Sequence, residues 1–287
     1  MKVTIKNLLH RVKESVPSTR EKVSAFLAHH FPGKAGKGGS VKIGDSKNNR
    51  IDKNNKYSDM QKNEYDATAH LMVVENHENH NKNPDYWNIL LRAIKSDPQK
   101  WNNKVALDFG CGAGRNVLNL LKSAEWKRVD GVDISKENIG NCLKFLEKNY
   151  SDKSKYDFAV NDGVSLSIYP SDVYDFVMST IVFQHICVYD IRLSLLREIF
   201  RVLKPGGLFS FQMGYGPGHP RAVPYRGNLY EASGTNGKMD VRVDSVYQIY
   251  DDLTTIGYKN ISHTISKSWD DAHRKWIYIE AYKPAEA

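Results

Sequence analysis

The chain of 287 residues has only three cysteines and no run of 18 apolar residues. The absence of such a run excludes a transmembrane helix, and an odd, sparse set of cysteines excludes a disulfide framework. The first residues also lack a continuous apolar segment and a small-residue cleavage site, so we expect no secretory signal. The sequence therefore indicates a cytoplasmic protein, with peripheral contact to a membrane as the alternative.

Excess positive charge is absent beyond the first 56 residues. Residues 1–56 hold 13 Lys and Arg against 4 Asp and Glu, whereas residues 57–287 hold 28 against 29. The net charge of +8 thus belongs to an N-terminal arm. A nearly neutral main domain argues against binding of duplex nucleic acid.

The arm itself lacks the composition of a folded core. Residues 1–31 contain two short amphipathic stretches that Pro17 separates, which predicts a basic helical arm. Residues 32–56 are rich in Gly, Lys and Asn, so we expect a flexible linker there and a main domain over 57–287. A membrane-surface contact, a partner contact and a solvated tail all fit residues 1–31.

From about residue 84 onward, helical and strand patterns alternate. The predicted strands lie at 104–109, 129–133, 158–161, 174–179, 208–213, 261–265 and 276–282, and the predicted helices at 84–95, 116–127, 136–150, 190–203 and 243–256. This alternation predicts a doubly wound, mainly parallel sheet. The last two strands have no helix between them, and so short a connection permits only an antiparallel pair.

The most informative segment is a glycine turn between a strand and a helix, with glycines at 110, 112 and 114. Glycine permits positive φ and lets the backbone approach a ligand closely. The spacing is not that of a dinucleotide site, which needs its third glycine where Arg115 stands. The turn therefore predicts a nucleoside ligand without a pyrophosphate.

Two acidic residues follow the next two predicted strands. Asp133 ends the strand 129–133, where a carboxylate suits the two hydroxyls of a ribose. Asp162 follows the strand 158–161 and is placed to accept from an exocyclic amine, although an aspartate before Gly163 is also typical of a capped turn.

Four segments in this order resemble the class I S-adenosylmethionine-dependent methyltransferases. They are Leu107–Gly114, Val132–Ser135, Tyr174–Ser179 and Leu203–Leu208, and the resemblance covers residues 84–213 in motif order. It implies a Rossmann-like, seven-stranded sheet with an antiparallel last strand. It also implies that S-adenosyl-L-methionine is the cofactor.

The resemblance implies roles for the residues around the turn. The cofactor-binding candidates are Asp108, Gly110, Gly112, Gly114, Arg115, Asp133, Ile134, Asp162, Gly163 and Ser179. Among these, Asp108 is expected to accept from the amino group of the cofactor, and Ile134 to pack on the adenine unless it is ordinary core. Arg115 either reaches the carboxylate of the cofactor or is a solvated or structural residue of the first helical turn.

Residues on the acceptor side are predicted from their place after the fourth and fifth strands. His185 is the candidate general base for a hydroxyl acceptor, with a structural role as the alternative. The irregular segment 214–240 is expected to be a substrate lid, because a long segment without regular structure inside a domain is often functional. Its candidate substrate residues are His219, Arg221, Tyr225 and Tyr230.

The acceptor class follows from what the fourth strand lacks. Ser179 is followed by Thr-Ile-Val-Phe, without the Asn/Asp-Pro-Pro-aromatic motif of families that methylate exocyclic amines. We therefore expect a small-molecule or sugar acceptor, methylated on a hydroxyl. The alternatives are a protein or RNA methyltransferase that uses the basic arm, and a cofactor-binding module without turnover. His77 and His80 lack a third ligand at a fitting spacing, so no metal is expected.

Overall fold

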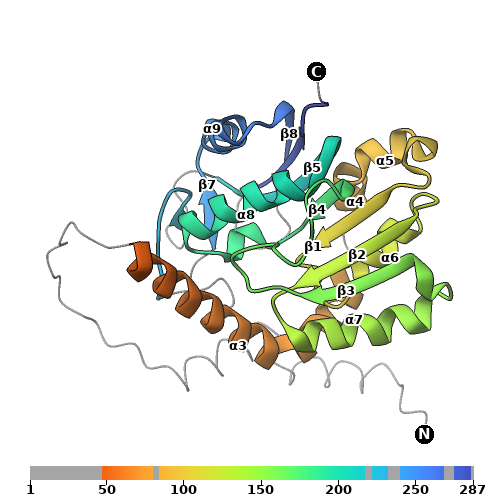
Figure 1. Ribbon diagram of the computed structural model, residues 1–287, viewed down its shortest axis with the longest axis horizontal. Coiled ribbons are helices and arrows are strands. Elements are labelled where there is room, and N and C mark those ends of the chain that lie inside the picture. Colours follow the sequence, from red (N-terminus) through yellow and green to blue (C-terminus); the bar gives the residue numbers. More distant parts are fainter. Residues whose placement is uncertain (1–46, 80–83, 217–221, 232–239, 268–274, 286–287) are drawn as a thin grey trace, which may run out of the picture. The chain divides into compact units, whose positions relative to one another are not determined.

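The computed structural model describes residues 47–79, 84–216, 222–231, 240–267 and 275–285 (Figure 1). Every described residue belongs to one compact unit, Asp45–Ala287. This unit begins before the predicted start at Tyr57, because helix α3 (Lys47–Asn79) begins at Lys47. The first turns of α3 are polar and mostly exposed, so their sequence does not differ from that of a linker.

The predicted seven-stranded sheet is present. Its strands, in spatial order, are β3 (Tyr156–Val160), β2 (Arg128–Asp133), β1 (Val105–Phe109), β4 (Tyr174–Ser179), β5 (Leu203–Tyr215), β9 (Lys275–Tyr282) and β8 (Lys259–Lys267). The first five are parallel, and β9 runs antiparallel to both β5 and β8. The antiparallel final pair is therefore confirmed.

Strand β5 is longer than predicted at both ends. It begins at Leu203, and its register against β4 shifts between Tyr174 and Phe176, opposite the Gly206–Gly207 pair. At its far end, residues 214 and 215 extend beyond β4 and pair with the short strand β7 (Val241–Val243). Strand β6 (Val223–Pro224) pairs in turn with β7. The segment after β5 thus adds two strands next to the carboxyl end of β4.

Helices cover both faces of the sheet. They are α4 (Pro84–Leu90), α5 (Arg92–Ser96), α6 (Arg115–Leu121), α7 (Lys136–Asn149), α8 (Tyr189–Val202) and α9 (Val246–Ile256). One buried cluster packs α8 and α9 against one face. A second cluster packs α4, α5, α6 and α7 against the other face. Because both faces are covered, the central strands are apolar almost throughout.

Residues at helix ends explain where α7 and α9 begin and end. The hydroxyl of Ser135 accepts from the N–H of Asn138 at the start of α7. Ser245 and Gln248 form a reciprocal capping box at the start of α9, which Gly257 ends with a φ of 120°. In the described part of the chain, no helix combines the length and apolar character that a bilayer span requires.

Candidate active site

The glycine turn follows β1 at the carboxyl edge of the sheet. The N–H groups of Gly110 and Cys111 both donate to the carbonyl of Val132, at 2.7 and 3.0 Å, which joins the turn to the end of β2. Gly110, Gly112 and Gly114 all have positive φ, of 77°, 52° and 90°. The predicted strand, tight turn and helix are therefore in place.

Two of these glycines are also required by contacts within the protein. A Cβ on Gly110 would clash with Cγ2 of Val182, and one on Gly114 would lie 2.5 Å from the sulfur of Cys142 on α7. The sequence explains these glycines by positive φ and by close approach to a ligand. The close packing of α7 and of the segment after β4 accounts for Gly114 and Gly110 independently.

Asp108 is a buried carboxylate without a hydrogen-bond partner among the described residues. The residue is 0% exposed, and neither of its carboxylate oxygens receives a hydrogen bond there. Burial raises the pKa of Asp108 to about 8, and the Asp133 carboxylate raises it further, whereas the nearby Arg115 guanidinium and the side-chain amide of Asn116 oppose the shift. An unpartnered carboxyl group in the core is costly unless something binds it. The ammonium group of an amino-acid ligand has the charge and donors that Asp108 lacks.

Asp133 is held between the glycine turn and α7. Its Oδ2 accepts from the N–H of Gly112 at 2.9 Å, and its Oδ1 accepts from the N–H of Ser135 at 2.9 Å and from the amide of Asn138 at 3.3 Å. Burial raises the pKa of Asp133, and these donors oppose the shift. Each carboxylate oxygen has two lone pairs, so Oδ1 is fully used, and Oδ2 keeps one lone pair for a ligand hydroxyl.

The segment after β4 contains a strained residue. Ile181 has a φ of 57°, which is rare for a β-branched side chain. Its N–H donates to Gln212 of β5 at 3.0 Å. The hydroxyl of Ser179 donates to the carbonyl of Phe109, and the amide of Asn116 on α6 donates to Thr180. Bonds to both neighbouring strands and to α6 therefore fix the path of this segment beside the glycine turn.

The predicted adenine contacts have a mixed outcome. A Cβ on Gly163 would lie 2.5 Å from Cδ1 of Ile134, so the two residues adjoin. The side chain of Asp162, however, accepts from the N–H groups of Val164 and Ser165 and from the Ser165 hydroxyl, at 2.7–2.9 Å. These bonds support the capped-turn alternative for Asp162.

Arg115 lies at the first position of α6, beside Asp108. Its guanidinium carbon is 5.4 Å from the ring centroid of Trp87, and its Nε donates to Asn116 at 3.4 Å. Stacking on Trp87 supports the structural alternative for Arg115. Its guanidinium is still close enough to Asp108 to oppose the rise in the pKa of that carboxyl group.

His185 lies in a short 3₁₀ helix, Phe183–His185, directly after the segment that follows β4. Its Nδ1 is 2.7 Å from Oδ1 of Asp240, and the two side chains are 20% and 12% exposed. Asp240 immediately precedes β7, so the added strands bring it to the carboxyl end of β4. Asp240 is absent from the site predicted by the sequence, where its only local signal is the alternation of Val241, Arg242 and Val243 after it.

Helix α3 lies across this edge of the sheet (Figure 1). The Ser58 hydroxyl donates to the carbonyl of Asp162, Gln61 donates to the carbonyl of His185 at 3.0 Å, and Asp66 accepts from the Ser135 hydroxyl at 2.6 Å. Burial raises the pKa of Tyr65, and the carboxylates of Asp240 and Asp133 raise it further. Tyr65 is thus close to both acids.

Of the four predicted substrate residues, the structure describes Tyr225 and Tyr230. Tyr225 is 2% exposed and packs over the buried guanidinium of Arg192, with its ring centroid 5.5 Å away, so its prediction as a substrate contact is wrong. Tyr230 donates to Asn54 of α3 at 3.2 Å, which places it against the helix. His219 and Arg221 lie outside the described residues.

The metal prediction concerned His77 and His80. His80 and the side chain of His77 lie outside the part of the chain that the structure describes. Within that part, no group of three or more potential ligand side chains is placed to hold a metal ion.

Comparisons with known proteins agree with this geometry. Residues 107–211 match the family model of a methyltransferase domain. A protein of Aspergillus luteorubrus, named a probable methyltransferase, is 30% identical over 107 residues, which are 36% of this chain and 38% of that protein. The demethylmenaquinone methyltransferase of Leptospira interrogans is 33% identical over 103 residues, or 36% of this chain and 40% of that enzyme. The chain thus spans about two fifths of the length of these relatives.

A similar solved structure is that of an S-adenosylmethionine-dependent methyltransferase from Methanosarcina mazei. The TM-score is 0.55 at 20% identity, and the match covers 67% of this chain and 98% of the other. At this identity the likeness shows the shared fold. Residues 107–211 thus match a methyltransferase domain, and the chain has the fold of a solved S-adenosylmethionine-dependent methyltransferase.

Proposed function

We propose that this protein transfers a methyl group from S-adenosylmethionine to a hydroxyl group of a small molecule or sugar. The observation that carries the proposal is the buried carboxylate of Asp108, which has no hydrogen-bond partner among the described residues and lies next to the glycine turn. A buried acid of this kind needs a cationic donor, and the amino-acid end of S-adenosylmethionine has one.

The residues present fit this methyl donor in two further ways. Asp133 keeps acceptor capacity for a ribose hydroxyl beside Gly112, and Ile134 adjoins Gly163, where an adenine ring would be bordered by apolar surface. In the proposed complex, Asp108 accepts from the ammonium group, Asp133 accepts from the ribose, and Ile134 packs on the base.

Bound S-adenosylmethionine supplies an electrophilic methyl group, so the protein mainly needs to orient the acceptor and exclude water. Helix α3 covers the edge of the sheet through contacts at Ser58, Gln61 and Asp66. His185, after β4, is placed to take the hydroxyl proton of the acceptor. The name of the Leptospira interrogans relative gives demethylmenaquinone as its substrate, which supports a small-molecule acceptor.

The test is incubation of the full chain with S-adenosylmethionine labelled in its methyl group and with fractionated cell extract. We expect label in a product of low molecular mass that is stable to alkali, as an ether is and a methyl ester is not. Label in protein or RNA would replace this proposal with the polymer alternative, which would use the basic residues 1–56. Binding of the donor without any labelled product would favour a module without turnover.

The arm is a separate proposal. Contact of residues 1–31 with an anionic membrane or with a partner remains a prediction, because these residues lie outside the described part of the chain. Cosedimentation of the full chain with anionic and with neutral vesicles distinguishes the lipid contact from the other two possibilities.

A further inference from the structure

We infer that Asp240 is a positioning residue that holds His185 in the form needed to deprotonate a hydroxyl acceptor. This inference rests on the proposed function, and it assigns the strands added after β5 a part in the chemistry. The direct observation is the contact of 2.7 Å between Nδ1 of His185 and Oδ1 of Asp240, in a pair that is mostly shielded from solvent.

The contact determines which nitrogen of the ring can accept a proton. An ionised carboxylate only accepts hydrogen bonds, so Nδ1 must carry the proton that it shares with Asp240. The neutral ring then has its lone pair on Nε2. Such a carboxylate also stabilises the imidazolium that forms when Nε2 takes a proton, because the opposite charge is already beside it.

The backbone around Asp240 is anchored in the core. Val241 and Val243 of β7 are both 0% exposed. The N–H of Val223 on β6 donates to the carbonyl of Asp240 at 2.9 Å, and β7 pairs with residues 214 and 215 of β5. The carboxylate therefore extends from a strand whose position is set by buried valines and by the sheet.

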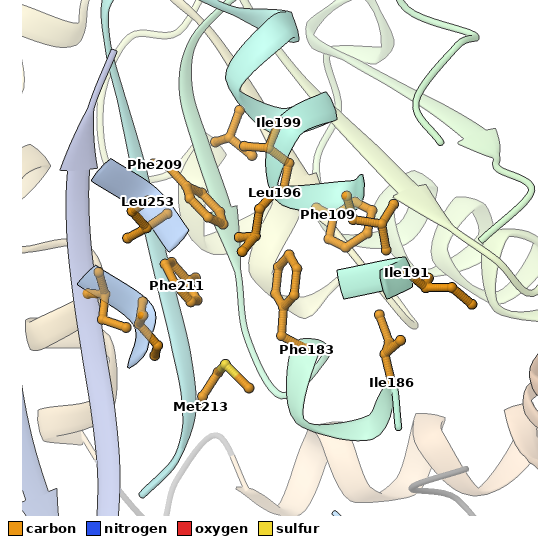
Figure 2. Packing of buried hydrophobic residues seen from close by; sticks show 14 of the residues in the cluster. Phe109, Phe183, Ile186, Ile191, Leu196, Ile199, Phe209, Phe211, Met213 and Leu253 are labelled. Carbon is orange, nitrogen blue, oxygen red and sulfur yellow. The ribbon is translucent and has the colours of Figure 1, made fainter. Parts of the chain in front are cut away.

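The backbone around His185 is anchored as firmly. Phe183, two residues earlier, is 1% exposed and packs among the rings of Phe109, Phe209 and Phe211, with centroid distances of 5.6, 6.1 and 5.6 Å (Figure 2). The N–H of His185 donates to the carbonyl of Val182 at 2.9 Å.

A buried cation joins the two anchored segments. Arg192 of α8 is 1% exposed, and its guanidinium donates both to the carbonyl of Ile186 and to the carbonyl of Tyr225. Ile186 follows His185, and Tyr225 follows β6. The same side chain therefore holds the 3₁₀ helix and the added strands together, which is a physical reason why Tyr225 is buried.

Other titratable groups face the pair from α3 and from the residues after the 3₁₀ helix. Asp240 and Glu64 both raise the pKa of Tyr65 after the larger effect of burial, and both raise the pKa of Cys187, for which burial is again the main cause. Glu64 thus lies near the pair, and so does the Arg192 guanidinium, which lowers the pKa of Cys187. Tyr65 and Cys187 stay neutral around the pair, so Asp240 and Glu64 favour a cationic His185 and Arg192 opposes it.

The acceptor hydroxyl gives its proton to Nε2 of His185, an oxygen lone pair forms the new C–O bond, and the electrons of the broken S–C bond stay on sulfur. The proton on Nδ1 remains in its bond with Asp240 throughout. The released proton later leaves Nε2 for solvent, so Asp240 is never consumed.

The first test needs no acceptor. Long-range ¹H–¹⁵N spectra of the full chain with ¹⁵N-labelled histidine report which ring nitrogen is protonated, and His185→Gln identifies the signals. We expect the neutral ring of His185 with its proton on Nδ1. Asp240→Asn should lower the pKa of His185 by about one unit, since it removes an adjacent opposite charge. The matched control is Asp244→Asn, because Asp244 lies just beyond β7 and pairs with Arg242 at 2.7 Å. A proton on Nε2, or equal shifts in both variants, would overturn the inference.

The second test uses the labelled extract fraction as acceptor. Asp240→Asn should reduce kcat about 100-fold, leave the Kd of S-adenosylmethionine unchanged and shift the pH profile, and Asp240→Glu should restore part of the rate. A normal kcat and pH profile in Asp240→Asn would contradict the positioning role. If no fraction accepts label, the proposed function is contradicted. The spectra still show, independently of that result, which ring nitrogen of His185 is protonated beside Asp240.

Discussion

The two halves of the site are built in different ways. On the cofactor side, Asp108, Gly112 and Asp133 come from one stretch that contains β1, the glycine turn and β2. On the acceptor side, His185 meets Asp240, which is 55 residues later, and Gln61, which is 124 residues earlier. The cofactor side depends on local turns and on adjacent parallel strands, whereas the acceptor side depends on three distant segments. The acceptor side can therefore change without disturbing the cofactor side, and the following predictions test this independence.

The largest effect is expected from His185→Gln. Glutamine keeps a polar side chain of similar size but cannot take a proton at neutral pH, so kcat should fall by about 10² to 10⁴. The Kd of S-adenosylmethionine should not change, because the cofactor side is intact. Turnover of the labelled extract fraction and equilibrium dialysis measure the two quantities. Equal losses in kcat and in affinity would show that the halves are not independent.

Asp108→Asn should have the converse effect. Loss of a charged hydrogen bond should weaken S-adenosylmethionine binding about 100-fold. Above about pH 8 the ligand-free variant should also melt at a higher temperature than the wild type, because an amide carries no charge where Asp108 would have to ionise in the core. Equilibrium dialysis and a thermal melt measure these opposite changes.

The matched control is Asp130→Asn, on the neighbouring strand. Asp130 is also buried, but it accepts from the Tyr174 hydroxyl and from Arg128, both at 2.9 Å. Its amide variant should lose stability and keep its affinity for the donor. If both variants lost affinity alike, burial of a carboxylate would be the cause, and the specific role of Asp108 would be refuted.

The pKa of Asp108, raised to about 8 by burial, predicts a pH dependence. The carboxyl group must ionise to pair with an ammonium group, so affinity should rise about tenfold from pH 6 to pH 7. In the ligand-free protein the folded state keeps this proton up to about pH 8, whereas the unfolded chain releases it near pH 4. The unfolded state thus binds fewer protons in that window, and stability should fall as pH rises through it.

Calorimetry in two buffers of different ionisation enthalpy measures the proton released on binding. Wild type should release nearly one proton from Asp108 at pH 7, and Asp108→Asn should release none from this site. Equal proton release by both proteins would assign the linkage to another group.

The smallest effect is expected where α3 meets the cofactor side. Asp66 accepts from the Ser135 hydroxyl at 2.6 Å and from the N–H of Glu137 at 3.2 Å, at the start of α7. Asp66→Ala should cost about 1 kcal/mol, as for the loss of a helix cap, which corresponds to about 2–4 °C in Tm. Asp59→Ala, at an exposed position of the same helix, should leave the Tm unchanged. Similar Tm losses in both would mean that the contact with Ser135 does not stabilise α7.

The same contrast explains what the sequence could predict. The order of the seven strands, the glycine turn and the place of Asp133 follow from apolar runs and local spacing, and the structure confirms them. The position of Asp240 depends on β7 pairing with the end of β5, a long-range contact that no spacing encodes. The sequence does not predict helix α3 for a different reason. The helix is polar along most of its length, and its few buried apolar residues, such as Tyr57 and Ala69, form no recognisable stripe.

Tyr225 illustrates the remaining error. An aromatic residue in a segment rich in Gly and Pro suggests a substrate contact. In the structure, the buried Arg192 of α8 donates a hydrogen bond to the carbonyl of Tyr225 and packs on its ring. Arg192 stood among apolar residues of a predicted helix, and its sequence position does not reveal which two carbonyls it joins.

The central claim is that the glycine turn, Asp108 and Asp133 together bind S-adenosylmethionine. Calorimetric titration of the full chain with this compound tests the claim most directly. We predict saturable binding of one molecule per chain, weakened in Asp108→Asn and in Asp133→Asn and unchanged in His185→Gln. The absence of saturable binding at millimolar concentrations, or binding that neither aspartate variant weakens, would contradict it.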